Sequence, residues 1–474
     1  MRSYGKLFIG GHWVDPAGSD VIEVHSPHDR SAVGTVPHAA PQDVDRAVAA
    51  ARAAFDDGPW PRTAPEERQR TVARFQELYA ARAAEFAALI TAENGSPITV
   101  TTGLNVRGLP EQTAAYLRAA AALEWEEKLP SGALLRREAV GVVAAIIPWN
   151  APHQSALAKM VPALLAGCTV VLKASPETAI DALALAEVFA EAGFPEGVVS
   201  VLPAGRGTSE YLVAHPGVDK VAFTGSTAAG REIAATAGER LKRVSLELGG
   251  KSAAIVLDDA DPTAVAHGLM YHSLGNNAEN CQAHTRILAP RSRYEETVQA
   301  VRAMMESLVV GDPARPDTFI GPMVRAGQQH RVRSFIELGI AEGARLVTGG
   351  PEVPEGLEGG YYVTPTLFAD VDNSMRIARE EIFGPVLVVI PFDDVEEAVR
   401  IANDSDYGLG GGVWSADHER AVGIARRIRT GTMLVNGAMP AFDGPFGGFK
   451  ASGTGREFGA VGLDQYIEYK SIAV

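Results

Sequence analysis

Residues 140–174 read VGVVAAIIPWNAPHQSALAKMVPALLAGCTVVLKA, and this stretch decides the fold class. It contains a continuous apolar run at 140–147, a helix pattern at 153–165 and a second apolar run at 169–173. Continuous apolar runs are typical of strands that a parallel sheet buries on both faces. A strand, a helix and a strand in this order predict a parallel βαβ unit.

The same alternation extends in both directions along the chain. It continues through a helix at 179–192, a strand at 198–202 and a strand at 220–224, which predicts a Rossmann-like parallel sheet of the dinucleotide-binding type. It restarts after Gly249-Gly250, which predicts a second α/β domain. The first third of the chain predicts long helices at 66–93 and 111–127.

These patterns define the expected domains. We expect a dinucleotide-binding domain at 1–249, a catalytic α/β domain at 250–442, and a return segment at 443–474. A hairpin near 125–143 and an alternating strand at 465–473 form a small β arm in this scheme. A terminal strand of this kind often pairs with another subunit, so we expect a homodimer or homotetramer.

Composition narrows the class of protein. The chain has 474 residues, 46% of them hydrophobic, and a formal net charge of −15 with no basic run. This balance argues against nucleic acid and anionic membranes as partners. No apolar run approaches the ~18 residues of a membrane span, and residues 1–15 lack the apolar core of a signal peptide. Two cysteines exclude a disulfide framework and favour the cytoplasm.

The two cysteines differ in their surroundings. Cys168 lies in an apolar run and is expected in the core. Cys281 follows the polar, turn-forming segment Gly-Asn-Asn-Ala-Glu-Asn, where a reactive thiol could be accessible. Taken alone, a lone cysteine of this kind is more often inert.

Glu247 and a glycine-bearing turn are the next candidates. Glu247 lies inside the strand-like apolar run Val-Ser-Leu-Glu-Leu, where burial would raise its pKa and suit it to general-base catalysis. Taken alone, it could be a glutamate at a surface edge. Residues 223–230 (FTGSTAAG) join a strand to a helix, and backbone N–H groups there could bind a pyrophosphate. Their spacing is not GxGxxG.

Several motifs in register across the chain resemble the aldehyde dehydrogenase superfamily. They are Ile147-Pro148-Trp149-Asn150, Lys173, Phe223-Thr224-Gly225-Ser226, Leu246-Glu247-Leu248-Gly249-Gly250-Lys251, Cys281, Glu381-Ile382-Phe383-Gly384-Pro385, Pro445-Phe446-Gly447-Gly448-Phe449-Lys450, and Ser452-Gly453-Thr454-Gly455-Arg456-Glu457. One such match is weak, but the full set in this order is specific.

The resemblance implies an NAD(P)-dependent enzyme that oxidises an aldehyde to an acid through a thioester. In that scheme Cys281 is the nucleophile, Asn150 belongs to the oxyanion hole, and Glu247 activates the hydrolytic water. Lys159 and Glu457 match positions proposed to relay the proton outward. They could instead be a solvated lysine and a partner in a structural ion pair.

The resemblance also implies which residues hold the cofactor. Lys173 and Glu381 match residues that bind the two riboses, an assignment consistent with their capacity to hydrogen-bond hydroxyl groups. The other matching positions line the nicotinamide and the pyrophosphate: Ile147, Pro148, Trp149, Gly225, Ser226, Gly230, Leu248 and Phe383. No metal is implied.

The sequence departs from the family pattern near the nucleophile and near Lys173. Ala278 and Glu279 replace the usual Gly and Gln; the alanine predicts an ordinary backbone φ, and the glutamate would disfavour a thiolate. Pro176 replaces a glutamate that repels a 2′-phosphate in many NAD-specific members. Glu177 is one residue out of place and no arginine is evident nearby, so we expect NAD with some tolerance of NADP.

Two alternatives and the substrate complete the prediction. A coenzyme-A-dependent acylating enzyme generally lacks the water-activating glutamate, and a silent binding relative would not need the nucleophile, the oxyanion residue and the base together. The segments 153–157, 277–280 and 438–442 are expected to line the substrate tunnel. They contain no arginine or lysine, which favours a neutral alkyl or aromatic aldehyde.

Overall fold

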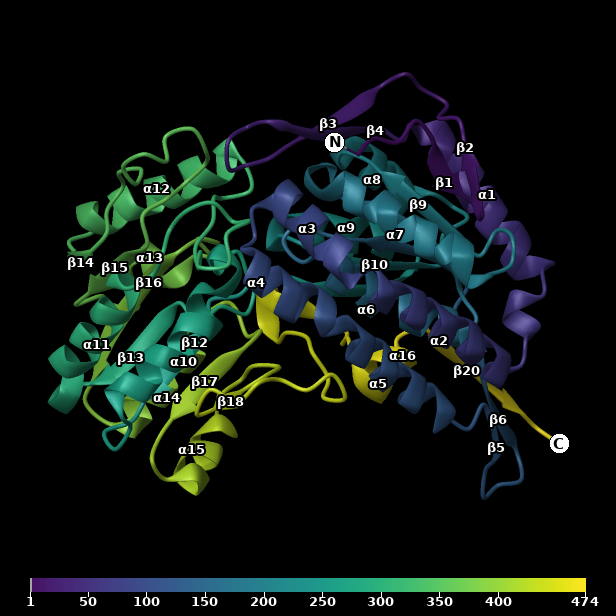
Figure 1. Cartoon of the computed structure of the whole chain (residues 1–474). Coiled ribbons are helices and arrows are strands. Elements are labelled where there is room, and N and C mark those ends of the chain that lie inside the picture. Colours follow the sequence, from purple (N-terminus) through teal and green to yellow (C-terminus); the bar gives the residue numbers. More distant parts are fainter. Residues whose placement is uncertain (1) are drawn as a thin grey trace.

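The computed structural model describes residues 2–474, with the side chains of all of them except residues 104 and 105. Figure 1 shows two α/β halves side by side, one coloured purple to teal and the other green. The chain crosses once into the green half and then returns to the first half as the yellow C-terminal segment. Each half is organised around its own sheet, as the sequence predicts.

The first half contains an eight-stranded sheet in the order β19-β11-β10-β7-β8-β9-β1-β2. Its strands are β1 (Leu7–Ile9), β2 (His12–Val14), β7 (Val142–Ile146), β8 (Thr169–Ala174), β9 (Val199–Pro203), β10 (Lys220–Thr224), β11 (Arg243–Glu247) and β19 (Gly453–Thr454). The five central strands β11, β10, β7, β8 and β9 are parallel to one another.

Helices cover both faces of this sheet. They are α1 (Pro41–Asp56), α2 (Pro65–Ala81), α3 (Ala83–Asn94), α4 (Ile98–Val100), α5 (Leu109–Ala121), α6 (Pro152–Ala166), α7 (Ala179–Ala192), α8 (Arg206–Ala214) and α9 (Thr227–Glu239). Helices α2, α3 and α5–α7 pack on one face, and α1, α8 and α9 pack on the other.

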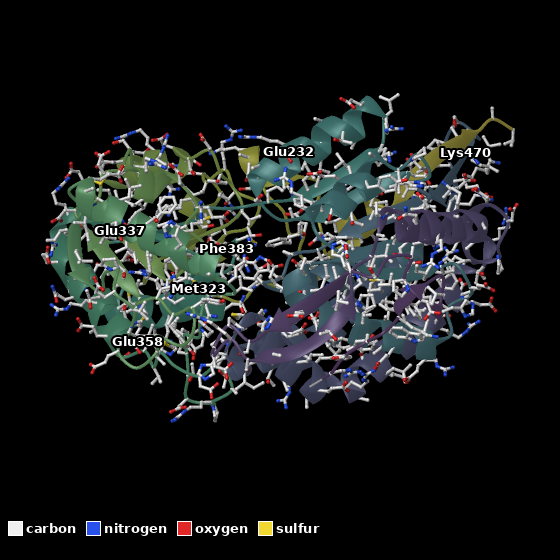
Figure 2. The ribbon with its side chains drawn as sticks, turned by 90° about the horizontal axis from the view of Figure 1, so that it is seen from above. Glu232, Met323, Glu337, Glu358, Phe383 and Lys470 are labelled. Atoms are coloured by element: carbon white, nitrogen blue, oxygen red, sulfur yellow. The ribbon has the colours of Figure 1, made fainter. Side chains whose placement is uncertain are left out.

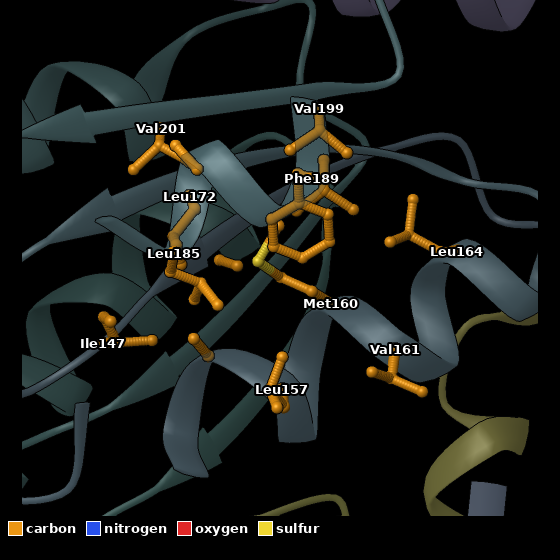
Figure 3. Close-up of a cluster of buried hydrophobic side chains, with 14 of the residues drawn as sticks. Ile147, Leu157, Met160, Val161, Leu164, Leu172, Leu185, Phe189, Val199 and Val201 are labelled. Carbon is orange, nitrogen blue, oxygen red and sulfur yellow. The ribbon is translucent and has the colours of Figure 1, made fainter. Parts of the chain in front are cut away.

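The core follows from the alternation of side chains along each strand. On β7, Val143 and Ala145 face α6 and α7, whereas Val142 and Ala144 face α1 and α8. Figure 3 shows the first of these interfaces, where Leu157 and Met160 of α6 meet Phe189 of α7. Burial of each such side chain contributes about 1.5–3 kcal/mol, so a strand that is apolar on both faces is held in the centre of the sheet.

The strand order creates a crevice at one edge of this sheet. From β7 the chain proceeds to β8 and β9 on one side, and then to β10 and β11 on the other. The carboxyl ends of β7 and β10 therefore flank the point where the winding reverses, which is where doubly wound proteins bind ligands. Helices α6 and α9 both begin at this edge.

The second half contains a seven-stranded sheet in the order β14-β15-β16-β13-β12-β17-β18. Its strands are β12 (Ala253–Val256), β13 (Arg286–Pro290), β14 (Arg345–Thr348), β15 (Thr366–Ala369), β16 (Val386–Phe392), β17 (Gly411–Trp414) and β18 (Leu434–Val435). Its helices are α10 (Pro262–Leu274), α11 (Tyr294–Glu306), α12 (Ala326–Ala341), α13 (Arg376–Arg379), α14 (Val395–Asn403) and α15 (His418–Ala425).

Two small sheets complete the fold. Strand β20 (Ile467–Ile472) pairs with β6 (Leu134–Ala139), which pairs with β5 (Glu126–Lys128). These strands and the C-terminus project from the first half, next to the short helix α16 (Gly459–Asp464) (Figure 1). Near the N-terminus, β3 (Val21–His25) pairs with β4 (Ala32–Pro37).

The structure corrects both expected helices of the first third. The pattern at 66–93 forms two helices that break at Arg82, because hydrophobic spacing continues across a break of one residue and cannot reveal it. The helix expected to reach residue 127 ends at Ala121, and residues 126–128 form β5 instead. Pairing with β6 outweighs the helix propensity of Glu-Glu-Lys.

Candidate active site

Cys281 lies in the loop between a short 3-10 helix (Gly275–Ala278) and β13, and its side chain is partly exposed. Its backbone packs against Gly250, where an added Cβ would lie 2.3 Å from the carbonyl oxygen of Cys281. Burial and the negative charges of Glu381 and Glu247 raise the pKa of the thiol to about 12. This environment favours the protonated form of the thiol. Cys168 is fully buried, as the sequence predicts.

The turn before Cys281 has an unusual backbone. Asn276, Asn277 and Ala278 have φ values of 59°, 60° and 56°, so three consecutive residues adopt the left-handed conformation. The expectation of an ordinary φ at Ala278 is wrong. The Asn277 amide explains why: it donates to the carbonyls of Gly95 and Pro322 at 3.0 and 3.1 Å, and these tertiary bonds fix the turn.

Asn150 is bonded to this turn. Its Nδ2 donates to the carbonyl oxygen of Glu279 at 2.8 Å, and the Nδ2 of Asn276 donates to the carbonyl oxygen of Asn150 at 3.0 Å. Asn276 Oδ1 in turn accepts a hydrogen bond of 2.6 Å from the Ser96 hydroxyl. Asn150 and the nucleophile loop are thus one hydrogen-bonded unit.

Glu279 does not behave as a simple charge beside the thiol. Its side chain is buried, and one carboxyl oxygen accepts a hydrogen bond of 3.2 Å from the backbone N–H of Val324. Burial raises the pKa of this carboxyl group well above its usual range, which favours the neutral form. A neutral acid resembles the glutamine that the family pattern has at this position.

Glu247 ends β11 at the carboxyl edge of the first sheet. It is 3% exposed, and neither carboxyl oxygen has a hydrogen-bond partner among the described residues. Burial and the negative charge of Glu457 raise its pKa well above the usual range, while Lys159 and Arg456 act in the opposite direction. A Cβ at Gly447 would lie 2.6 Å from Glu247 Oε1, so only glycine leaves room for the carboxylate.

Lys159 and Glu457 meet next to this carboxylate. The Lys159 ammonium, on α6, donates to Glu457 Oε1 at 2.6 Å and to the Thr224 hydroxyl at 2.5 Å. Lys159 is 1% exposed, which excludes the alternative of a solvated helix lysine. The structure therefore brings both residues predicted from the family resemblance into contact.

Lys173 is at the end of β8, on the same edge of the sheet. Burial lowers the pKa of its ammonium to about 8, against the opposing effect of Glu177. Glu177 accepts a hydrogen bond of 2.5 Å from the Ser175 hydroxyl and forms an ion pair of 3.2 Å with Arg325. The expectation that no arginine lies near this position is wrong, because Arg325 comes from a distant part of the sequence.

The glycine-bearing turn connects β10 to α9. Ser226 is the N-cap of α9, and its hydroxyl oxygen accepts a hydrogen bond of 3.3 Å from the N–H of Ala229. A Cβ at Gly230 would lie 2.5 Å from the Leu248 side chain, so this glycine permits close packing of α9 on the sheet. Gly225 begins the turn and donates its N–H to the carbonyl of Glu247 at 3.0 Å.

The other predicted cofactor residues lie where the two halves meet. Trp149 follows β7, and its ring meets Phe383 of the second half edge to face, with centroids 5.6 Å apart. In Figure 2, Phe383 lies on the side of the green half that faces the rest of the molecule. Glu381 Oε1 accepts a hydrogen bond of 3.0 Å from the N–H of Gly250. Ile147 and Leu248 are buried, and Pro148 is partly exposed.

These residues fit a dinucleotide. The ammonium of Lys173 has no hydrogen-bond partner among the described residues, and ribose hydroxyls would supply acceptors. The N-terminus of α9 offers backbone N–H groups to a pyrophosphate. Within residues 2–474, no helix is long and apolar enough to cross a membrane.

Sequence reasoning missed four contributors to the site: Asn276, Asn277, Gly447 and Arg325. The Asn-Asn pair carried a usable signal, because asparagine tolerates the left-handed conformation better than other non-glycine residues. Gly447 lies in one of the family motifs, but its contact with Glu247 carried no signal. Arg325 carried none either, since its partner comes from another part of the chain.

Comparison with known proteins agrees with this arrangement. The sequence model of the Aldehyde dehydrogenase family matches residues 13–472. The chain is 47% identical to geranial dehydrogenase of Castellaniella defragrans, over 98% of each chain. It is 43% identical to 3-succinoylsemialdehyde-pyridine dehydrogenase of a Pseudomonas species, over 100% of this chain and 99% of the relative.

Solved structures agree as well. An aldehyde dehydrogenase of Mycobacterium tuberculosis in complex with NAD+ superimposes with a TM-score of 0.98 at 49% identity, covering 100% of this chain and 98% of the other. A mutant of aldehyde dehydrogenase C of Pseudomonas syringae, complexed with NAD+ and octanal, gives 0.96 at 41% identity over 98% and 96%. The fold and site are those of an oxidoreductase that binds NAD. The chain belongs to the aldehyde dehydrogenase family, whose members oxidise aldehydes to carboxylic acids.

Proposed function

We propose that this enzyme oxidises a neutral aldehyde to a carboxylic acid, with NAD as hydride acceptor, through a thioester on Cys281. The observation that carries the proposal is the buried carboxyl group of Glu247, whose oxygens have no hydrogen-bond partner among the described residues. It lies near enough to Cys281 for its negative charge to raise the pKa of the thiol. The NAD+ complexes of the relatives from Mycobacterium tuberculosis and Pseudomonas syringae support the choice of cofactor.

Acylation begins when the sulfur of Cys281 bonds to the aldehyde carbon. The thiol proton passes to the carbonyl oxygen, which gives a thiohemiacetal. The second N–H of the Asn150 amide and the backbone N–H of Cys281 stabilise the negative charge that develops on that oxygen. NAD+, when bound, accepts the hydride from this carbon. The hydroxyl proton is released to water, and a thioester remains.

Deacylation uses Glu247 as the base. A water molecule attacks the thioester carbon and transfers a proton to the Glu247 carboxylate, forming the C–O bond as the C–S bond breaks. The departing thiolate then takes the proton from Glu247, which restores the thiol and the Glu247 carboxylate, and the acid leaves. A carboxylate without hydrogen-bond partners is suited to this task, because nothing competes with the water for its oxygens. Lys159 and Glu457, which are bonded to each other beside this base, would relay its proton outward.

Family resemblance and the position of these residues support the proposed cofactor contacts. Lys173 holds the adenosine ribose and Glu381 the nicotinamide ribose. The residues that shape the rest of the cleft are Ile147, Pro148, Trp149, Gly225, Ser226, Gly230, Leu248 and Phe383. We propose NAD as the preferred cofactor and NADP as an accepted one.

The substrate class follows from the expected tunnel segments, which contain no cationic side chain. The names of the relatives include geranial and octanal, both neutral aldehydes, which supports an alkyl or aromatic substrate. We propose that the enzyme is a homodimer or homotetramer. We place it in the cytoplasm, where reducing conditions would keep the Cys281 thiol free.

The test is to trap the intermediate. Wild type mixed with octanal and NAD+ and quenched with acid should carry an octanoyl adduct on the Cys281 peptide in mass spectrometry. Cys281→Ala should lack both the adduct and NADH production. NADH formation by Cys281→Ala would contradict the proposal, because hydride transfer would then not need the thiol. Adduct formation on coenzyme A, in place of hydrolysis, would favour the acylating alternative.

A further inference from the structure

One ion pair links the two halves of the molecule beside the expected adenosine site. Arg325 Nη1 lies 3.2 Å from Glu177 Oε1. Glu177 belongs to the short 3-10 helix Pro176–Thr178 that follows β8 in the first half, and Arg325 is the N-cap of α12 in the second half. The pair therefore links the two halves next to the expected dinucleotide site.

The backbone that supports Arg325 is fixed. The preceding residue, Val324, donates its N–H to the Glu279 carboxyl, and the carbonyl of Arg325 accepts the N–H groups of Gln328 and Gln329 at 3.0 Å. The Gln328 amide also donates to the carbonyl of Phe383 at 2.6 Å. The backbone around Arg325 is thus held by hydrogen bonds to Glu279, in the loop before Cys281, and to Phe383, on the expected nicotinamide side of the site.

The guanidinium of Arg325 is held less firmly than its backbone. Its side chain is 61% exposed, and the only ion-pair partner among the described residues is Glu177. An exposed ion pair in water contributes little stability, so a stronger anion nearby can replace the carboxylate. A phosphate group is such an anion, because the planar guanidinium can bond two of its oxygens at once.

Glu177 and Lys173 form the other side of this position. The negative charge of Glu177 acts on the Lys173 ammonium, so the two side chains are electrostatic neighbours at the end of β8. Ser175 holds Glu177 in place through a hydrogen bond of 2.5 Å. A ribose bound to Lys173 would therefore have a carboxylate and a guanidinium within reach of its hydroxyl groups.

We propose that Arg325 and Glu177 together determine whether the enzyme accepts NAD or NADP. With NAD, Glu177 accepts a hydrogen bond from a ribose hydroxyl and keeps Arg325 as its partner. With NADP, the Arg325 guanidinium leaves Glu177 and binds the 2′-phosphate together with Lys173. This inference rests on the proposed cofactor site, since it takes Lys173 as the residue that binds the adenosine ribose.

Nucleotide binding tests this inference without turnover. Isothermal titration of the purified full-length enzyme with 5′-AMP and with adenosine 2′,5′-bisphosphate isolates the adenosine end of the cofactor. Arg325→Ala should weaken the bisphosphate about tenfold or more and change 5′-AMP less than about twofold, since loss of a charge-assisted bidentate contact is of this size. Arg325→Lys should restore part of the loss.

The opposite change is expected at the carboxylate. Glu177→Gln removes the repulsion and should strengthen the bisphosphate while weakening 5′-AMP. Arg315→Ala is the matched control, because Arg315 is an exposed arginine of the same half that pairs with Asp317. The ratio of kcat/KM values for NADP and NAD should follow the binding ratio in each variant.

Two outcomes would overturn the inference. If Arg325→Ala lowers the affinity for both nucleotides equally, or for neither, Arg325 does not bind the 2′-phosphate. If the wild type binds neither adenine nucleotide, the proposed cofactor site is contradicted, and so is the proposed function. The two failures are distinguishable because in the first the wild-type enzyme still binds both nucleotides, whereas in the second it binds neither.

Discussion

The side-chain amide of Asn150 donates a hydrogen bond of 2.8 Å to the backbone carbonyl of Glu279, two residues before Cys281. One N–H of this amide is therefore bonded to the loop that carries Cys281. The second N–H is the one that we propose for the oxyanion hole.

Asn150→Ala should lower kcat by roughly 10²-fold, the usual effect of removing one oxyanion donor. The measurement is steady-state NADH formation under saturating aldehyde. Asn94→Ala is a useful control, since the Asn94 amide bonds the carbonyl of Trp149 at 3.1 Å and supports the same segment without facing the substrate. A decrease in kcat of only a few-fold in Asn150→Ala would show that Asn150 does not belong to the oxyanion hole.

Glu247→Gln should slow deacylation more than acylation, because the base acts chiefly on the hydrolytic water. Stopped-flow absorbance should show a burst of about one NADH per active site, followed by slow turnover. Loss of the burst itself would mean that Glu247 also takes part in thiol addition or hydride transfer.

Ala278→Gly should stabilise the protein by about 1 kcal/mol, because a left-handed φ costs an L-residue ~1–2 kcal/mol and the gain is partly offset by the freedom of glycine when unfolded. Chemical denaturation measures the change. Ala283→Gly, on the other side of the nucleophile and without a positive φ, should be destabilising. Destabilisation by both substitutions would show that the Ala278 methyl group contributes more packing than strain.

Glu279→Gln should raise the melting temperature more at pH 8 than at pH 4. Burial raises the pKa of Glu279 in the folded protein, so the unfolded chain ionises first as the pH rises above about 4.3. This difference costs stability above that pH and disappears below it, and glutamine removes it. Glu355, which is exposed, provides the control Glu355→Gln. An equal effect of Glu279→Gln at both pH values would indicate that Glu279 is ionised in the folded state.

The enzyme should form a homodimer or homotetramer. Strand β20 occupies the edge of its sheet, paired with β6 on one side only, and Tyr469 on it is 50% exposed. An edge strand of this length invites pairing with another subunit. Light scattering at micromolar concentration measures the mass, and a species of 50 kDa, the mass of one chain, would contradict this prediction.

The sequence by itself determined the two parallel sheets, because continuous apolar runs such as Val142–Ile146 are stable only when both faces are covered. It also placed Cys281, Glu247 and Asn150 among the candidates, since their motifs occur in a fixed order along the chain. It failed at the break of the helix at Arg82, which the continuous hydrophobic spacing hides, and at the φ of Ala278, where long-range hydrogen bonds outweigh local preference.

Only the tertiary structure decided which side chains meet. Lys159 contacts Glu457 although 298 residues separate them, and Arg325 contacts Glu177 across the two halves. The same holds for the environment of Glu247, whose carboxylate owes its space to Gly447. Hydrophobic periodicity and backbone propensity act over a few residues, whereas charge, burial and the room left for a carboxylate depend on chain segments that meet only after folding.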